Sequence, residues 1–163
     1  AGIMLVRYKA VADKFYEAID WDLLGFFAAL FVVINVMEHA LVLQLIGTGL
    51  STIIDAPSDI AAAGLLAVSA IFSSVTDNIP LAAMLAKILQ AREHVPEQLW
   101  WSVIFGANLG GNLTPIGSAS TLVAVTIIHK YKIKLSFAGF IRKALPYALV
   151  HIALAIIYVL LFF

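Results

Sequence analysis

Asp77 is the only carboxylate within a long apolar stretch, which makes it the first candidate for chemistry. Ionisable groups in apolar membrane segments are costly and usually mark an ion or proton pathway. A carboxylate here can bind a cation or accept a proton. It can also act as the N-cap of a helix that begins near Pro80, because a carboxylate accepts hydrogen bonds from free backbone N–H groups. The sequence favours the first role and leaves the second open.

Neutral side chains with polar oxygens follow Asp77 and recur in a second polar segment further along the chain. Amide and hydroxyl oxygens suit hard cations, and the same groups cap helices or join neighbouring helices by hydrogen bonds. Ser73, Ser74, Ser120 and Thr121 stay undecided between these roles. The candidate substrate- or ion-binding residues are Asp77, Asn78, Asn108, Asn112, Thr114 and Ser118.

Two short segments, 78–80 and 112–115, place an asparagine shortly before a proline. Proline lacks an N–H and disfavours helix at the preceding residue, so each segment predicts that one helix stops and another starts. Such irregular backbone is tolerated at membrane depth only where it is buried in protein or lines a watery cavity. The residues expected to form these structural breaks are Pro80, Gly110, Gly111, Pro115 and Gly117.

The composition is that of a membrane protein. Of the 163 residues, 63% are hydrophobic and 12% are charged, and the mean hydropathy is +1.01; soluble domains carry about 25% charged residues. Ten basic residues balance ten acidic ones, so no basic excess indicates nucleic-acid binding. The absence of cysteine excludes disulfides and thiolate metal sites. We therefore predict an all-α polytopic membrane protein that is not an enzyme and has no cofactor.

The hydropathy pattern divides the chain into helical segments. The apolar start before Arg7 predicts the end of a preceding helix, so we expect the C-terminal part of a longer protein. Both arms of 60–91 are shorter than the about 20 residues that a membrane span requires, which favours a re-entrant hairpin over two short crossings. The expected segments are a helix end at 1–6, a polar surface loop at 7–22, a span over 23–37 that continues to residue 43, a connector at 44–59, the hairpin at 60–91, a broken helix at 98–129 whose second half is opened by Pro115, a basic loop at 130–143, and a last span at 144–163 with Pro146 in its first turn.

The distribution of lysine and arginine predicts the topology. The loops 7–22 and 130–143 hold most of these residues, so the positive-inside rule places both in the cytoplasm. One full span, a hairpin that returns to its own side and one broken span satisfy this requirement. The C-terminus is then expected on the non-cytoplasmic side of the membrane.

Other polar residues are assigned ordinary roles. Glu38 and His39 are expected at a polar helix end, and Lys87 and Arg92 are expected to extend toward the membrane surface. His151, in the last span, is expected to be a packing residue.

Three motifs in the chain resemble those of the ion transporter superfamily. The residues that carry the resemblance are 19–21 followed by 24–27, then 73–80, and 106–118. The likeness is greatest to the branch of arsenite-pump membrane subunits and D-type sodium/proton antiporters, with a citrate-transporter-like domain. The resemblance implies the C-terminal one of two inverted repeats. It also implies that substrate and ions bind between the hairpin tip, the loop of the broken helix and the other repeat. Thr121 stands where family members often have asparagine.

The expected function is secondary active transport by alternating access, with Na⁺ or H⁺ as the coupling ion and sodium/proton antiport ranked first. Transport of an anion such as arsenite or a dicarboxylate is the alternative on the same scaffold. A half-repeat that serves only as a membrane scaffold is a further alternative. The expected partners are the lipid bilayer and the N-terminal inverted repeat; a homodimer stays open, and no nucleic acid is expected.

Overall fold

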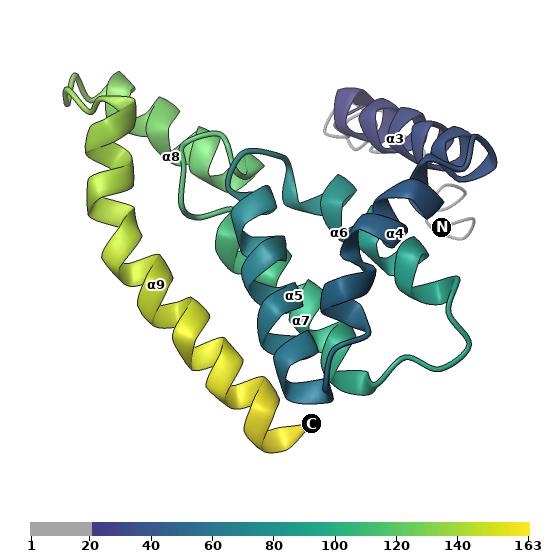
Figure 1. Ribbon diagram of the computed structural model, residues 1–163. Helices are drawn as coiled ribbons and strands as arrows, with labels where there is room; N and C mark the ends of the chain where they lie inside the picture. The colour runs from purple at the N-terminus through teal and green to yellow at the C-terminus, as the bar shows by residue number, and fades with distance from the viewer. Residues whose placement is uncertain (1–20) are drawn as a thin grey trace, which may run out of the picture. The chain divides into compact units, whose positions relative to one another are not determined.

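Seven helices and no strand make up the described part of this protein, residues 21–163 of the computed structural model (Figure 1). The expected helix end at 1–6 and most of the surface loop 7–22 lie outside the described residues. The chain divides into two compact units, 1–36 and 37–163. All contacts discussed below lie within the second unit. The helices are α3 (Trp21–His39), α4 (Val42–Ile54), α5 (Ser58–Ser73), α6 (Asn78–Gln90), α7 (Glu97–Gly110), α8 (Ala119–Lys130) and α9 (Phe137–Phe162).

The first apolar segment ends earlier than predicted. Helix α3 stops at His39, and Leu41 adopts a left-handed conformation with a φ of 59°, so the span does not continue to residue 43. Most of the expected connector 44–59 is also helical, because α4 runs from Val42 to Ile54 and buries Leu43 and Ile54. Gly47 allows this helix to approach α6 closely, since a Cβ atom there would lie 3.1 Å from Ile88 Cγ2.

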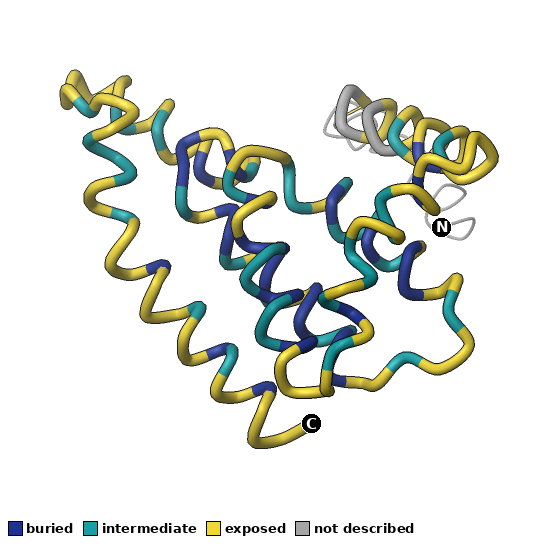
Figure 2. Tube along the Cα trace, viewed as in Figure 1, coloured by how far each residue is buried: buried dark blue, intermediate teal, exposed yellow. Residues whose placement is uncertain are grey.

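Helices α5 and α7 form the core. Buried residues concentrate in these two helices (Figure 2). A Cβ atom on Gly106 would lie 2.5 Å from the Leu66 carbonyl oxygen, and one on Gly110 would lie 2.1 Å from that of Ala70. The two backbones therefore approach through small residues, as in helix pairs of membrane proteins. Gly110, predicted as part of a break, is the last residue of α7 and serves this packing.

The segment 60–91 is interrupted at 74–77, between α5 and α6. Helix α6 begins at Asn78, and Pro80 lies in its first turn, where the missing N–H of a proline costs nothing. The re-entrant position of this hairpin in a membrane stays a prediction.

The segment 98–129 is interrupted by a loop over 111–118, but its second half does not begin at Pro115. Helix α8 begins at Ala119, after Ser118. The Ser118 side chain accepts from the Thr121 N–H, and the Thr121 hydroxyl accepts from the Ser118 N–H, which completes a capping box. These two reciprocal bonds fix the helix start, so Pro115 belongs to the loop.

The last helix begins earlier than predicted. Helix α9 starts at Phe137 because the Ser136 hydroxyl accepts a hydrogen bond from the Gly139 N–H at 3.0 Å. Pro146 therefore lies inside the helix and not in its first turn. Part of the predicted basic loop 130–143 becomes helical as a result, including Arg142 and Lys143.

The described residues contain one helix, α9, that is long and apolar enough to cross a membrane by itself. The segments 28–39 and 42–54 also qualify if they are counted together as one bent span. Helices α5 and α8 are apolar but shorter. A polytopic arrangement is compatible with these lengths and stays a prediction.

Candidate functional site

Asp77 lies at the tip of the α5–α6 hairpin and caps α6. Its Oδ1 atom accepts a hydrogen bond from the Ile79 N–H at 3.2 Å. The capping role that the sequence left open is therefore present. The bond occupies one carboxylate oxygen and keeps the charge at the positive end of the helix dipole, where a carboxylate is stabilised.

Asn78 connects this tip to α7. Its Nδ2 group donates to Asn108 Oδ1 at 3.3 Å, and Asn108 Nδ2 donates to the Ile104 carbonyl at 2.7 Å. Asp77, Asn78 and Asn108 thus lie together, where the hairpin tip meets the last turn of α7. We call these three residues the tip group. Asp77 and Asn78 are half-buried and Asn108 is exposed.

Hydroxyl groups join the two breaks to each other. The buried Thr114 hydroxyl donates to the Ser74 carbonyl and accepts from the Ile116 N–H at 3.3 Å. The buried Ser73 hydroxyl donates to the Ala107 carbonyl. Thr114 and Ser73 therefore satisfy backbone groups that the helix ends leave free, which supports a structural role for both.

Gly111 and Gly117 lie where backbone segments of the second break touch. A Cβ atom on Gly117 would lie 2.7 Å from the Gly111 carbonyl oxygen and 3.0 Å from that of Ser73. Any larger residue would push the loop away from the hairpin. Ser118 belongs to the capping box of α8, so its hydroxyl also serves the fold.

Asn112 does not join the tip group. Its Nδ2 group donates to the Asn108 carbonyl across 3.5 Å, and its side chain lines a separate cavity between the loop, α8 and α9. The six candidates thus divide into the tip group, two structural residues (Thr114 and Ser118) and Asn112. Among the described residues no group of three His, Asp or Glu could hold a metal ion.

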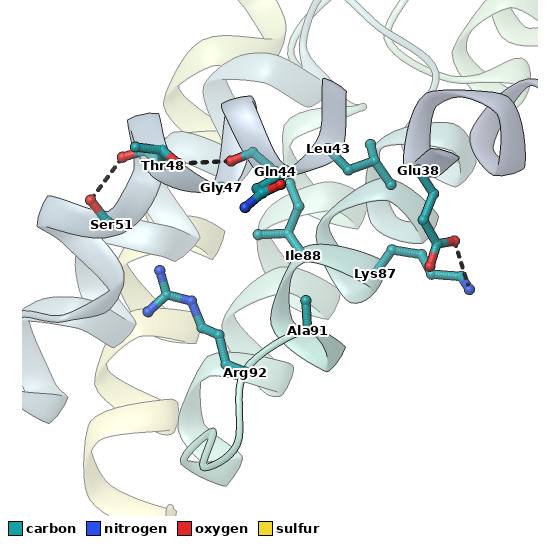
Figure 3. Close-up of a pocket in the computed structure, with 10 residues that line it drawn as sticks. All are labelled: Glu38, Leu43, Gln44, Gly47, Thr48, Ser51, Lys87, Ile88, Ala91 and Arg92. Atoms are coloured by element: carbon teal, nitrogen blue, oxygen red, sulfur yellow. Dashed lines mark hydrogen bonds and ion pairs between the residues drawn. The ribbon is translucent and has the colours of Figure 1, made fainter. Parts of the chain in front are cut away.

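A second polar region, which the sequence analysis does not predict, lies between α4 and α6. Lys87 Nζ lies 3.1 Å from Glu38 Oε2, and Arg92 pairs with Asp55. Glu38, Lys87 and Arg92 line a cavity of about 450 Å³. Figure 3 shows Glu38 and Lys87 on one side of the pocket and Arg92 on the other, below Thr48 and Ser51. The partners are far apart in the sequence, so spacing gives no signal for either pair.

The first 106 residues match the family model described as "Citrate transporter". This match covers the whole hairpin, with Asp77 and Asn78, and α7 as far as Gly106, so Asn108 lies just beyond it. The chain belongs to the citrate transporter family. The predicted resemblance to citrate-transporter-like ion transporters is thus confirmed.

Relatives of this citrate transporter family chain include membrane proteins and transporters. It is 31% identical to a 46 kDa membrane protein of Mycobacterium leprae and 30% identical to an uncharacterised transporter of Mycobacterium tuberculosis, over 97% of the chain and 38% of each relative. It is 34% identical to the human P protein over 87% of the chain and 18% of that protein. The chain therefore spans well under half the length of these relatives. No solved structure matches it significantly.

Proposed function

We propose that this chain forms one half of the ion-binding region of a secondary active transporter, and that cation or proton coupling occurs at Asp77. The observation that carries the proposal is the tip group, in which a carboxylate and two asparagines meet between two interrupted helices. Paired discontinuous helices around a polar site are the usual way in which secondary transporters bind ions near the midplane. The transporter family of the chain supports the same class of function.

Exchange of sodium for protons is the mode that the tip group favours. A carboxylate attracts a cation or takes up a proton, and competition between the two for one carboxylate couples their movements. A bare anion would be repelled by Asp77 unless a cation lay between them. The amide oxygens of Asn78 and Asn108 add neutral ligands suited to a hard cation.

Transport of a citrate-like carboxylate together with a cation is the second candidate. The description of the matching family favours it. Asp77 would then hold the cation that lies between the protein and the substrate. Transport of arsenite or a dicarboxylate on the same scaffold, and a half-repeat without transport of its own, are further alternatives.

The test is proton flux in liposomes that contain the intact parent protein, with a pH-sensitive dye inside. Sodium, lithium, citrate and arsenite are added in turn to the wild type and to Asp77→Asn. Asparagine caps helices about as well as aspartate, so this variant removes the charge and keeps the cap. Asp59→Asn is the matched control, because Asp59 is an exposed acid in the first turn of α5.

We expect sodium or lithium to evoke proton movement in the wild type and in Asp59→Asn, and little or none in Asp77→Asn. Proton movement only with citrate would select the second candidate. Equal proton movement in the wild type, Asp59→Asn and Asp77→Asn would show that Asp77 is not part of the coupling site. A wild type that moves no ion or substrate would favour the non-transporting alternative.

A further inference from the structure

Helix α9 carries a lone histidine in a stretch that is otherwise free of charge. Beyond Lys143 this helix has no Asp, Glu, Lys or Arg, and His151 lies near its middle. The sequence analysis expects a packing residue here. Among the described residues His151 is exposed, is hydrogen-bonded to Tyr147 and lines a cavity of about 430 Å³, so the packing expectation stays a prediction.

The hydrogen bond of His151 determines which tautomer its neutral ring adopts. Its Nδ1 atom lies 2.7 Å from the carbonyl oxygen of Tyr147, one turn earlier in α9. A carbonyl oxygen can only accept, so Nδ1 must carry a hydrogen. In the neutral ring Nε2 then has a free lone pair, and this is the atom that takes up a proton.

The cavity around His151 offers further acceptors but no compensating charge. Asn112 from the loop and Thr121 from α8 line it with His151. The Thr121 hydroxyl already donates to the Ser118 carbonyl at 2.8 Å, and Asn112 directs its amide nitrogen at Asn108, which leaves Asn112 Oδ1 as an acceptor. Tyr147 is the other titratable residue in the lining, which contains no acid, lysine or arginine.

We propose that His151 is a second proton-binding residue of the transporter, separate from Asp77; this inference rests on the proposed function. A proton from the aqueous phase binds Nε2 and leaves from the same atom later in the cycle, so no other group is consumed. Protonation turns an acceptor into a positively charged donor. Protonation of His151 therefore adds a positive charge that no acid in the lining offsets, and this charge opposes entry of a cation.

The first test is the pH dependence of flux through the parent protein in liposomes. His151→Gln keeps a polar side chain that cannot titrate between pH 5 and 8, and His94→Gln is the control in an exposed loop. A required protonation changes the rate by up to about tenfold per pH unit on its limiting side. We expect the flux of His151→Gln to lose one pH-dependent change of rate that the wild type shows. His94→Gln should keep this pH dependence. An unchanged profile in His151→Gln would overturn the proposal.

The second test does not depend on transport. Nitrogen-15 spectra of histidine-labelled parent protein are recorded from pH 5 to 8, and the His151 signals are assigned as those missing from His151→Gln. We expect the Nδ1–H form at high pH and a doubly protonated ring at low pH. An Nε2–H form throughout, or no titration, would overturn the inference. If the wild type shows no flux, this result counts against the proposed function. The spectra test the protonation of His151 independently of transport.

Discussion

The two helix breaks differ in what fills them. The turn between α5 and α6 spans 74–77 and contains no buried residue. The loop between α7 and α8 spans 111–118 and buries Gly111, Thr114, Pro115 and Gly117. The first break carries a carboxylate, and the second has no charged residue.

This difference follows from the cost of burial. Burying a polar group without a hydrogen-bond partner is unfavourable, and burying an unpaired charge is far more so. In the second break, the Thr114 hydroxyl therefore donates to a backbone carbonyl, and the glycines make close backbone contacts. The first break, which buries no residue, can keep the half-buried charge of Asp77. The shorter break thus carries a charged side chain, whereas the longer one satisfies backbone groups and packs closely against its neighbours.

The largest effect is expected at the close contact between α5 and α7, which supports both breaks. We call this contact, formed by Gly106 and Gly110 against Leu66 and Ala70, the seam. Gly110→Val puts a Cβ atom against the backbone of Ala70, which no side-chain rotation can relieve. We expect a loss of unfolding free energy of about 3 kcal/mol or more. Denaturant titration of the parent protein in micelles measures it.

Gly49→Ala is the matched control for this seam. No atom lies within 4 Å of a Cβ placed there, and the residue is inside α4, so alanine should raise stability by about 0.5–1 kcal/mol. Equal stability of Gly110→Val and the wild type would mean that the two helices do not cross as closely as described.

The next effect tests whether the longer break is structural. Thr114→Val keeps the shape of the side chain but removes the hydrogen bond to the Ser74 carbonyl. We expect a loss of about 1–3 kcal/mol, because the part-buried Ser74 carbonyl loses its hydrogen-bond partner. Thr126→Val is the control, because the exposed Thr126 hydroxyl donates to the Leu122 carbonyl of its own helix, α8. A stable Thr114→Val protein without transport would instead make Thr114 a binding residue.

The smallest effect separates the two roles of Asp77. Asp77→Ala removes the cap and should cost about 1 kcal/mol of unfolding free energy, whereas Asp77→Asn should cost almost nothing. Both variants lack the charge, so both should lose coupled flux. If activity followed stability, with Asp77→Asn active and Asp77→Ala inactive, Asp77 would be only a cap. The same denaturant titration, run beside the flux assay, gives the answer.

The sequence indicates where helices are interrupted better than where they begin. Proline and glycine near Asn78 and Asn112 predict both breaks, because their backbone preferences are local. The start of α8 depends on a reciprocal pair of hydrogen bonds at Ser118, and the start of α9 on the Ser136 cap. Serine is common in many contexts, so neither start stands out, and Pro115 and Pro146 are assigned to the wrong positions.

The candidate site is predicted in part for the same reason. The sequence can single out Asp77 because a carboxylate in an apolar stretch is rare. It cannot divide the neutral candidates between binding and structure, because that depends on which carbonyl lies nearby in space. Thr114 faces Ser74, forty positions earlier in the chain, and His151 faces the loop that contains Asn112. Both relations arise only from tertiary packing.

The glycine and alanine seam between α5 and α7 also limits how such a protein can diversify. At Gly106 and Gly110 the opposing backbone leaves no room for a side chain. Amino-acid substitutions during evolution are therefore confined to the smallest residues at these two positions. The tip group has no such restriction, because its side chains extend from the end of the seam toward the surface. Substitutions can therefore accumulate at the tip while the scaffold beneath it stays the same.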